Sequence, residues 1–223
     1  MTSSLLRIPA LFVLGAMLAC NAFTVMAAPI PDPILDAPLA TTKGEKTAVL
    51  AGGCFWGVEA VFEHVRGVIN VTSGYAGGSA KSARYEKVGR GDTGHAEAVR
   101  ITYDPSRITY GKLLQIFFAV AHDPTELNRQ GPDTGTQYRS AIFYSDEEQK
   151  RISEAYIKQL NLAQVFRRPV VTELAVLKAF YQAESYHQDY ARRHPNEPYI
   201  RINDLPKVEA FRQQFPDLYI SRW

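Results

Sequence analysis

The segment Gly52-Gly53-Cys54-Phe55-Trp56-Gly57 constrains the fold of this 223-residue chain more than any other. A short apolar run over 47–51 precedes it, and apolar side chains then recur at helical spacing from Phe55 to Val65. This pattern predicts a strand, a glycine turn and a helix with one buried face. Cys54 is therefore expected at the helix N-terminus, where free N–H groups and the helix dipole favour a thiolate. The alternative is that Cys54 is a small buried apolar side chain.

Composition indicates one globular domain of ordinary size. Hydrophobic residues make up 46% of the chain and charged residues 22%, and the formal net charge is only +2. Proteins that bind nucleic acid usually carry a strong basic excess or patch, so we expect no nucleic-acid partner. We expect a monomer.

The N-terminus resembles an export signal over residues 1–28. Arg7 precedes an apolar run over 11–19, and small residues follow up to Ala28. The pattern predicts an exported, periplasmic protein; the alternative is a lipid anchor on Cys20. Residues 29–45 hold four prolines and are predicted to form an extended linker ahead of a single domain over 46–223 with a C-terminal tail. The chain has two cysteines, so loss of the leader would leave Cys54 as the single thiol.

Hydrophobic periodicity predicts an α+β protein. Strands are expected at 47–51, 67–75, 96–103, 141–144 and 169–174, and helices at 54–65, 110–121, 145–160, 183–190 and 205–215. Ser145 and Glu148 have the spacing of a capping box for the third helix. The order β-α-β-β-α-β predicts a two-layer sandwich with a ferredoxin-like split βαβ core, in which helices pack on a mixed sheet.

The strand over 96–103 carries an acid on its apolar face. A period of two places Glu97 with Val99, Ile101 and Tyr103. Such a glutamate lies either at the mouth of a site or is buried and protonated.

None of the five histidines lies in a setting that marks it as a catalytic base. His64 is expected on the exposed face of its helix, and His194 in a solvated loop. His95-Ala96-Glu97 matches half of a zinc deaminase signature, but the P-C-x-x-C half is absent, so we expect no metal site.

A thiol, an acid on an apolar face and several aromatic side chains remain as candidates for chemistry. They suit a substrate with a small apolar group beside a polar oxygen, because aromatic rings hold the one and O–H donors reach the other. Each aromatic residue has the alternative of plain packing. The aromatic candidates are Phe55, Trp56, Tyr85, Tyr138 and Tyr186.

Five motifs in order resemble the A-type peptide methionine sulfoxide reductases, over about residues 46–190. They are Gly-Cys-Phe-Trp-Gly at 53–57, Gly-Tyr-Ala-Gly-Gly at 74–78, Gly-His-Ala-Glu at 94–97, His-Asp-Pro-Thr at 122–125 and Gly-Thr-Gln-Tyr-Arg-Ser at 135–140. The resemblance implies reduction of the S epimer of methionine sulfoxide, free or in peptides, which is a repair of oxidised methionine.

The resemblance also implies a role for each matching residue. Cys54 would attack the sulfoxide sulfur and become a sulfenic acid, and Glu97 would protonate the departing oxygen. Tyr85 and Tyr138 would donate hydrogen bonds to that oxygen. The substrate would be held by Phe55, Trp56 and Asp133.

The tail over 192–223 lacks the cysteines with which many family members resolve the sulfenic acid. We therefore expect no bound cofactor and an external thiol reductant: a thioredoxin-like protein, a glutaredoxin or a small molecule. Two alternatives remain for the function. One is a one-Cys peroxidase or acyl-transfer enzyme, and the other is a non-catalytic module that binds methionine-containing peptides.

Overall fold

A computed structural model describes residues 30–223; the predicted export signal and Cys20 lie outside this range. Its strands are β1 (Lys46–Gly52), β2 (Val68–Ala76), β3 (Ala96–Tyr103), β4 (Arg129–Gln130), β5 (Asp133–Thr134), β6 (Ser140–Tyr144), β7 (Glu173–Val176) and β8 (Phe180–Gln182). Its helices are α1 (Phe55–Glu63), α2 (Tyr85–Val88), α3 (Tyr110–Ile116), α4 (Glu147–Leu162), α5 (Tyr190–Arg193) and α6 (Leu205–Gln214). Short 3-10 or π turns add η1 (Ala80–Ser82), η2 (Phe117–Ala121), η3 (Thr136–Tyr138) and η4 (Ile200–Asp204).

The central sheet confirms the predicted α+β fold with its split βαβ core. Six strands lie in the order β7-β6-β1-β3-β2-β8, and β4 and β5 form a separate hairpin. The inner four, β6-β1-β3-β2, are all antiparallel, with Leu50 of β1 opposite both Val99 of β3 and Ile142 of β6. β7 extends one edge in parallel and β8 the other edge antiparallel, which makes the sheet mixed.

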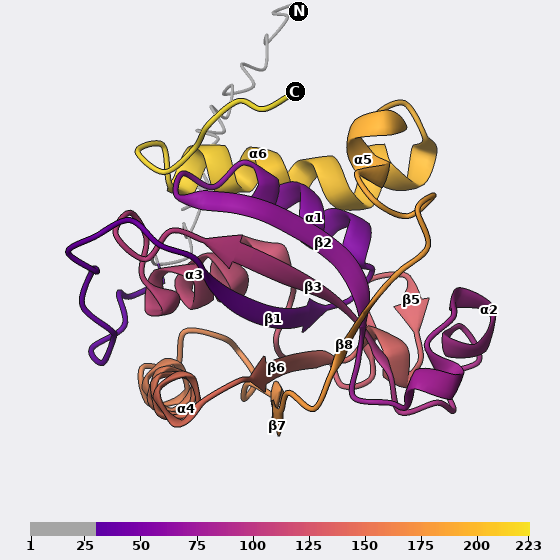
Figure 1. Cartoon of the computed structure of the whole chain (residues 1–223), viewed down its shortest axis with the longest axis horizontal. Coiled ribbons are helices and arrows are strands. Elements are labelled where there is room, and N and C mark those ends of the chain that lie inside the picture. The colour runs from indigo at the N-terminus through magenta and orange to yellow at the C-terminus, as the bar shows by residue number, and fades with distance from the viewer. Residues whose placement is uncertain (1–29) are drawn as a thin grey trace, which may run out of the picture.

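The two faces of the sheet are covered differently (Figure 1). Ala48 and Leu50 of β1 point into a large core to which α1, α3, α4 and α6 contribute. Val49 and Ala51 point the other way, into a small cluster dominated by alanines. Leu177 and Phe180 cover this second face, on the segment that leads into β8. The bulk of the helical layer therefore lies on one side.

The chain just ahead of β1 packs on the domain in an extended form. The Asp36 carboxylate accepts hydrogen bonds from the Gly111 N–H (2.7 Å) and the Thr109 hydroxyl, at the start of α3. The Tyr156 hydroxyl of α4 donates to the Pro31 carbonyl (2.7 Å). These bonds fix the described part of the proline-rich stretch against two helices.

Two of the predicted elements are wrong in the region after α4. The strand expected at 169–174 begins at Glu173, and the helix expected at 183–190 is a series of turns followed by α5. The turns form because the Gln188 side chain bonds both the N–H and the carbonyl of Ser73, at the edge of β2 beyond β8. Asp189 then takes a left-handed conformation, with φ of 53°.

His64 and the cap of α4 also differ from expectation. His64 is 1% exposed, because Tyr219 and Trp223 of the C-terminal tail pack against its ring. The N-cap of α4 is Asp146, one residue later than predicted; its carboxylate accepts from the Gln149 N–H at 2.8 Å.

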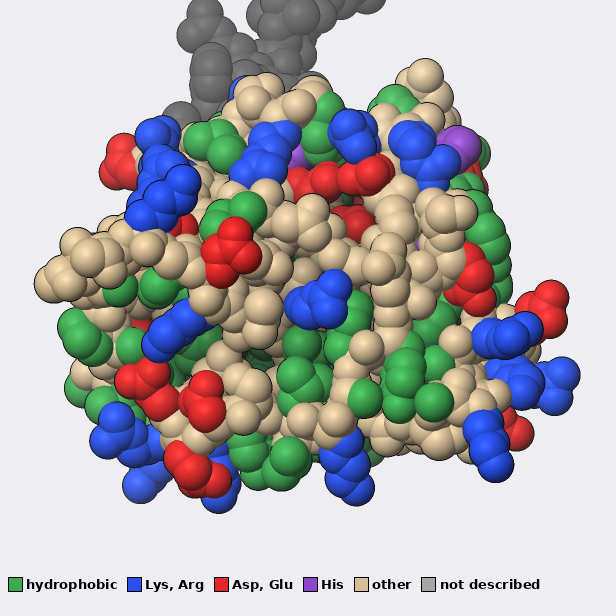
Figure 2. Space-filling model, in the orientation of Figure 1, with side chains coloured by type: hydrophobic (Ala, Val, Ile, Leu, Met, Phe, Trp, Pro, Cys, Tyr) green, Lys and Arg blue, Asp and Glu red, His purple; other side chains and the backbone are tan. Residues whose placement is uncertain are grey.

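The surface carries mixed charge. Figure 2 shows acidic and basic side chains interspersed over the face that it presents. Within residues 30–223, no helix has the length and apolar character needed to cross a bilayer.

Candidate active site

The turn between β1 and α1 places Cys54 at the N-cap of α1. Gly53 has φ of +91°, and a Cβ at this position would collide with the Gln130 side chain. Glycine is therefore required both by the backbone conformation and by the close approach of the β4–β5 hairpin. Cys54 is 8% exposed, so only a small part of its side chain faces solvent.

Glu97 lies at the start of β3, next to the end of the antiparallel strand β1, and is 3% exposed. Its Oε2 accepts a hydrogen bond from the Phe55 N–H at 3.1 Å. Burial raises the pKa of this carboxyl to about 8, and the charges of Asp133 and Asp204 act in the same direction, against the Phe55 N–H. Glu97 is therefore mostly protonated at neutral pH.

One pocket of about 210 Å³ brings together all seven residues to which the family resemblance gave a role. Phe55 and Trp56 come from α1, while Tyr85 begins α2 and Tyr138 ends η3. The complete lining is Cys54, Phe55, Trp56, Tyr85, Glu97, Asp133, Tyr138 and Tyr199. Tyr186, another aromatic candidate, is exposed and does not line the pocket.

The aromatic wall is held in place from behind. Trp56 stacks on Tyr190 with ring centroids 3.8 Å apart and an interplanar angle of 8°. Its indole N–H donates to Nδ1 of His187 at 3.2 Å. Phe55 is almost fully buried and packs against His187 and Tyr75. The flat face that Trp56 presents to the pocket thus has little freedom.

Three tyrosines supply hydroxyl groups at the pocket. Burial raises the pKa of Tyr85 and of Tyr138, and the Glu97 charge adds to both shifts, so both hydroxyls stay protonated and able to donate. Tyr199, just before η4, was not identified from the sequence. Its hydroxyl donates to the Asp133 carboxylate, and its ring lies edge-on to Trp56.

The expected low pKa of Cys54 is wrong for the protein without substrate. Burial raises the pKa of the thiol well above its ordinary value, and the charges of Glu97 and Asp204 raise it further. The Trp56 N–H at the start of α1 and the Lys207 ammonium lower it, but less strongly. Cys54 is therefore a thiol at rest, and an ionised Glu97 would make its deprotonation harder still.

Asp204 and Lys207, from the start of α6, were also missed by the sequence patterns. Asp204 is fully buried, and burial raises its pKa to about 6. Its Oδ1 lies 3.5 Å from Nζ of Lys207. Gly57 makes room for this pair, because a Cβ on Gly57 would collide with the Asp204 carboxylate.

The histidines do not form a base for Cys54. His122 is buried with a pKa lowered by burial to about 3, and its ring nitrogens contact the Phe117 carbonyl and the Ser140 hydroxyl. His95 contacts the Gly78 N–H and the Ser79 carbonyl. Within residues 30–223, no group of three or more His, Cys, Asp or Glu side chains is arranged to hold a metal ion.

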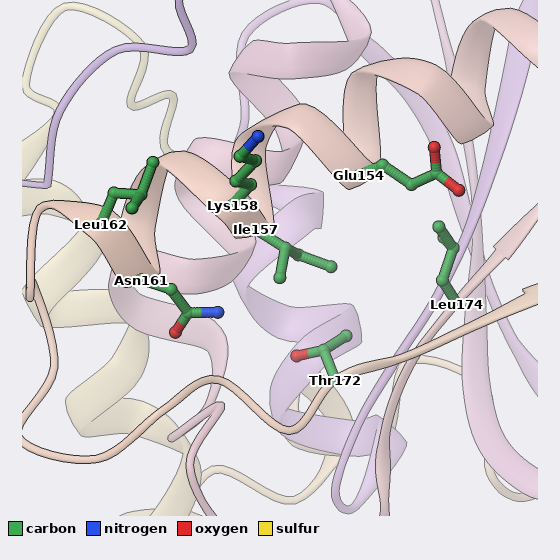
Figure 3. Close-up of a pocket in the computed structure, with 7 residues that line it drawn as sticks. All are labelled: Glu154, Ile157, Lys158, Asn161, Leu162, Thr172 and Leu174. Carbon is green, nitrogen blue, oxygen red and sulfur yellow. The ribbon is translucent and has the colours of Figure 1, made fainter.

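A larger hollow of about 610 Å³ lies between α4 and the chain that enters β7 (Figure 3). Its side chains are Glu154, Ile157, Lys158, Asn161, Leu162, Thr172 and Leu174. It has no thiol and no aromatic ring, so it lacks the chemistry of the Cys54 pocket.

Comparison with known proteins agrees with this geometry. The family model described as peptide methionine sulfoxide reductase matches residues 46–219. The chain is 57% identical to peptide methionine sulfoxide reductase MsrA 2 of Mesorhizobium japonicum, over 80% of this chain and 92% of that protein. It is 50% identical to peptide methionine sulfoxide reductase MsrA 2 of Synechocystis sp., over 92% of this chain and 97% of that protein.

Solved structures give the same assignment. Mxr1 from Saccharomyces cerevisiae in reduced form superimposes with a TM-score of 0.62 at 31% identity, covering 72% of this chain and 94% of that one. Methionine sulfoxide reductase A of Corynebacterium diphtheriae gives a TM-score of 0.58 at 35% identity, covering 70% of this chain and 78% of that one. A buried thiol, a protonated carboxyl and an aromatic wall lie in one pocket, and the similarity extends over most of the chain. The protein belongs to the peptide methionine sulfoxide reductase family.

Proposed function

We propose that this protein reduces methionine S-sulfoxide, free or within oxidised proteins, to methionine with Cys54 as the oxygen acceptor. One observation supports this most directly: a buried thiol and a protonated carboxyl line the same aromatic pocket. Membership of the family supports the substrate class. The activity is a repair of oxidised methionine.

The pocket fits the two ends of a methyl sulfoxide. The methyl group packs on Phe55 and Trp56, and the sulfoxide oxygen accepts hydrogen bonds from Glu97, Tyr85 and Tyr138. Sulfoxide oxygen is a poor leaving group until it is protonated, so a carboxylic acid that keeps its proton at neutral pH suits this task. Asp133, held by the Tyr199 hydroxyl, borders the same space.

Protonation by Glu97 and attack by Cys54 complete the first half of the reaction. The sulfur–oxygen bond of the substrate breaks, and the oxygen ends on the Cys54 sulfur as a sulfenic acid. The substrate leaves as the thioether of methionine. The thiol proton and the transferred oxygen form the new S–OH group, so Glu97 returns to its protonated state. Protonated Glu97 also adds no negative charge beside Cys54, which eases formation of the thiolate.

Regeneration of Cys54 depends on an external thiol. Cys54 is the sole cysteine in residues 30–223, so no second thiol of this part of the chain can form a disulfide with it. A thioredoxin-like dithiol protein or a small thiol would supply the two electrons. We further propose that the protein is a monomer and that it is exported to the periplasm; the pattern of residues 1–28 supports the export.

The test is turnover of the separated methionine sulfoxide epimers by residues 29–223. With dithiothreitol, the S epimer alone is expected to be converted. Without a reductant, one methionine per enzyme should form, and a dimedone-reactive sulfenic acid should appear on Cys54. Cys54→Ser should abolish both. Faster oxidation of Cys54 by hydrogen peroxide than by the sulfoxide would instead favour the peroxidase interpretation, and tight binding without conversion would favour the peptide-binding module.

A further inference from the structure

Cys54 also lines a second, smaller recess of about 60 Å³. Asp133 and Tyr199, which are hydrogen-bonded to each other, border both this recess and the substrate pocket. The remaining lining is different: Gln130, Gly131, Pro132, Asn203 and Lys207. The Cys54 sulfur can therefore be approached from two directions.

The size and position of this recess suit a thiol. Its volume of about 60 Å³ is less than a third of the roughly 210 Å³ of the substrate pocket. That admits the terminal CH₂–SH of a reductant but not a methionine side chain. The outer rim is the tip of the β4–β5 hairpin, where Gly131 and Pro132 are exposed. The recess therefore lies between solvent and the Cys54 sulfur.

Lys207 is the one cationic side chain among the residues that line the recess, and the Asp133 carboxylate lines it too. The Lys207 side chain is 20% exposed, and its contact with Asp204 is long, at 3.5 Å. Asp204 is fully buried, and its Oδ2 accepts no hydrogen bond from any described residue. Because Gly57 has no side chain, both groups can lie against the first turn of α1, beside Cys54. Lys207 lies near enough to Cys54 for its charge to lower the pKa of the thiol, although the charge of Asp204 raises that pKa by more.

We infer that this recess, hereafter the reductant recess, is where an external thiol attacks oxidised Cys54, and that Lys207 attracts and stabilises the attacking thiolate. The inference rests on the proposed function, because that reaction produces the sulfenic acid. Displacement at sulfur requires the nucleophile to approach opposite the leaving group. The hydroxyl of the sulfenic acid comes from the sulfoxide and therefore points into the substrate pocket. The attacking thiolate then reaches the Cys54 sulfur from the opposite side, through the reductant recess.

The step balances with two thiols as the reductant. The first thiolate forms a disulfide bond with Cys54 while the sulfur–oxygen bond breaks, and the hydroxyl leaves as water with the proton of that thiol. A second thiol, on the same or another molecule, attacks the mixed disulfide. Cys54 returns as a thiol, and the reductant departs oxidised to a disulfide. Both electrons come from the reductant.

The test separates the two halves of the reaction. One equivalent of methionine S-sulfoxide converts the enzyme to its sulfenic acid, and release of methionine gives the first rate. A thiol is then added, and loss of the dimedone-reactive species gives the second rate. The probes are 2-mercaptoethanesulfonate, which is anionic, and cysteamine, which is cationic, compared at equal thiolate concentration.

Lys207→Gln should slow reduction by the anionic thiol about tenfold more than it slows methionine release, and should reduce the preference for the anionic thiol over cysteamine. Asn203→Met, which adds volume to the recess, should slow both thiols relative to methionine release. Lys158→Gln removes an exposed lysine from α4, far along the chain from the site, and should change neither rate.

The outcomes distinguish the two proposals. Normal methionine release with an unchanged second rate in both Lys207→Gln and Asn203→Met would overturn the reductant recess and leave the proposed function standing. Failure of the unaltered protein to release methionine at all would overturn the proposed function. If Lys207→Gln does not fold, the thiol rates of Asn203→Met decide the inference.

Discussion

Glu97→Gln should stabilise the folded protein while it removes most of the activity. The pKa of Glu97 is about 8 in the fold and 4.5 ordinarily, so the unfolded chain loses its proton at lower pH than the folded chain. Ionisation of the unfolded chain therefore lowers the free energy of unfolding as pH rises from about 4.5 to about 8. Glutamine has no such ionisation, and its Oε1 can still accept the hydrogen bond from the Phe55 N–H.

The size of the effect follows from the shift in pKa. Each pKa unit corresponds to about 1.36 kcal/mol. The increase in the free energy of unfolding caused by Glu97→Gln should therefore be near zero at about pH 4 and reach about 3 kcal/mol at pH 7. Urea titrations at several pH values measure it as a change in midpoint at constant slope. Glu147→Gln is the control, because the Glu147 side chain is 85% exposed and the change should stay within about 0.5 kcal/mol.

Activity should move in the opposite direction. The glutamine amide donates a hydrogen bond but no proton, so single-turnover release of methionine should fall about 10²–10⁴-fold. In the unaltered protein, loss of the Glu97 proton should slow this step as pH rises through about 8. A stability difference between Glu97→Gln and the unaltered protein that is the same at pH 5 and pH 8 would refute the argument that the acid is neutral in the fold.

Three further substitutions test the surroundings of the site. Gly57→Ala should lower stability by about 1–3 kcal/mol and slow methionine release, because its Cβ collides with Asp204; unchanged values in urea and single-turnover assays would contradict this. Asp36→Ala should cost about 1–3 kcal/mol by leaving the Gly111 N–H without its partner, with activity per folded enzyme kept; equal urea midpoints would contradict it. Trp56→Ala should raise KM for the sulfoxide about tenfold, measured in steady state, and an unchanged KM would remove Trp56 from the binding wall.

Local patterns predicted the centre of the molecule well. The turn at Gly53 and the period-two face of Glu97 depend on residues close in sequence, and the structure reproduces both. The pKa of Cys54 was predicted in the wrong direction, because it depends on burial and on charges brought by distant elements. Tyr199 and Lys207 belong to the tail, where no periodicity marks a site, so only the folded chain shows that they reach Cys54.

The burial of His64 has the same origin. Helical spacing alone places this residue toward solvent, and the covering side chains, Tyr219 and Trp223, follow it by more than 150 positions. The turns at 183–189 also needed tertiary information, since the Gln188 side chain bonds Ser73 of β2, which is distant in sequence.

The small volume of the Cys54 pocket sets which damaged residues can be repaired. About 210 Å³ holds the end of one side chain and leaves the neighbouring residues of a peptide outside. A pocket of this size does not contact the residues on either side of the methionine. Selection among oxidised methionines must therefore come from how far each side chain protrudes from its own protein. Oxidised methionines at flexible or partly unfolded positions should therefore be reduced first. Those packed in a stable interior should be reduced only after local or global unfolding of the protein that contains them.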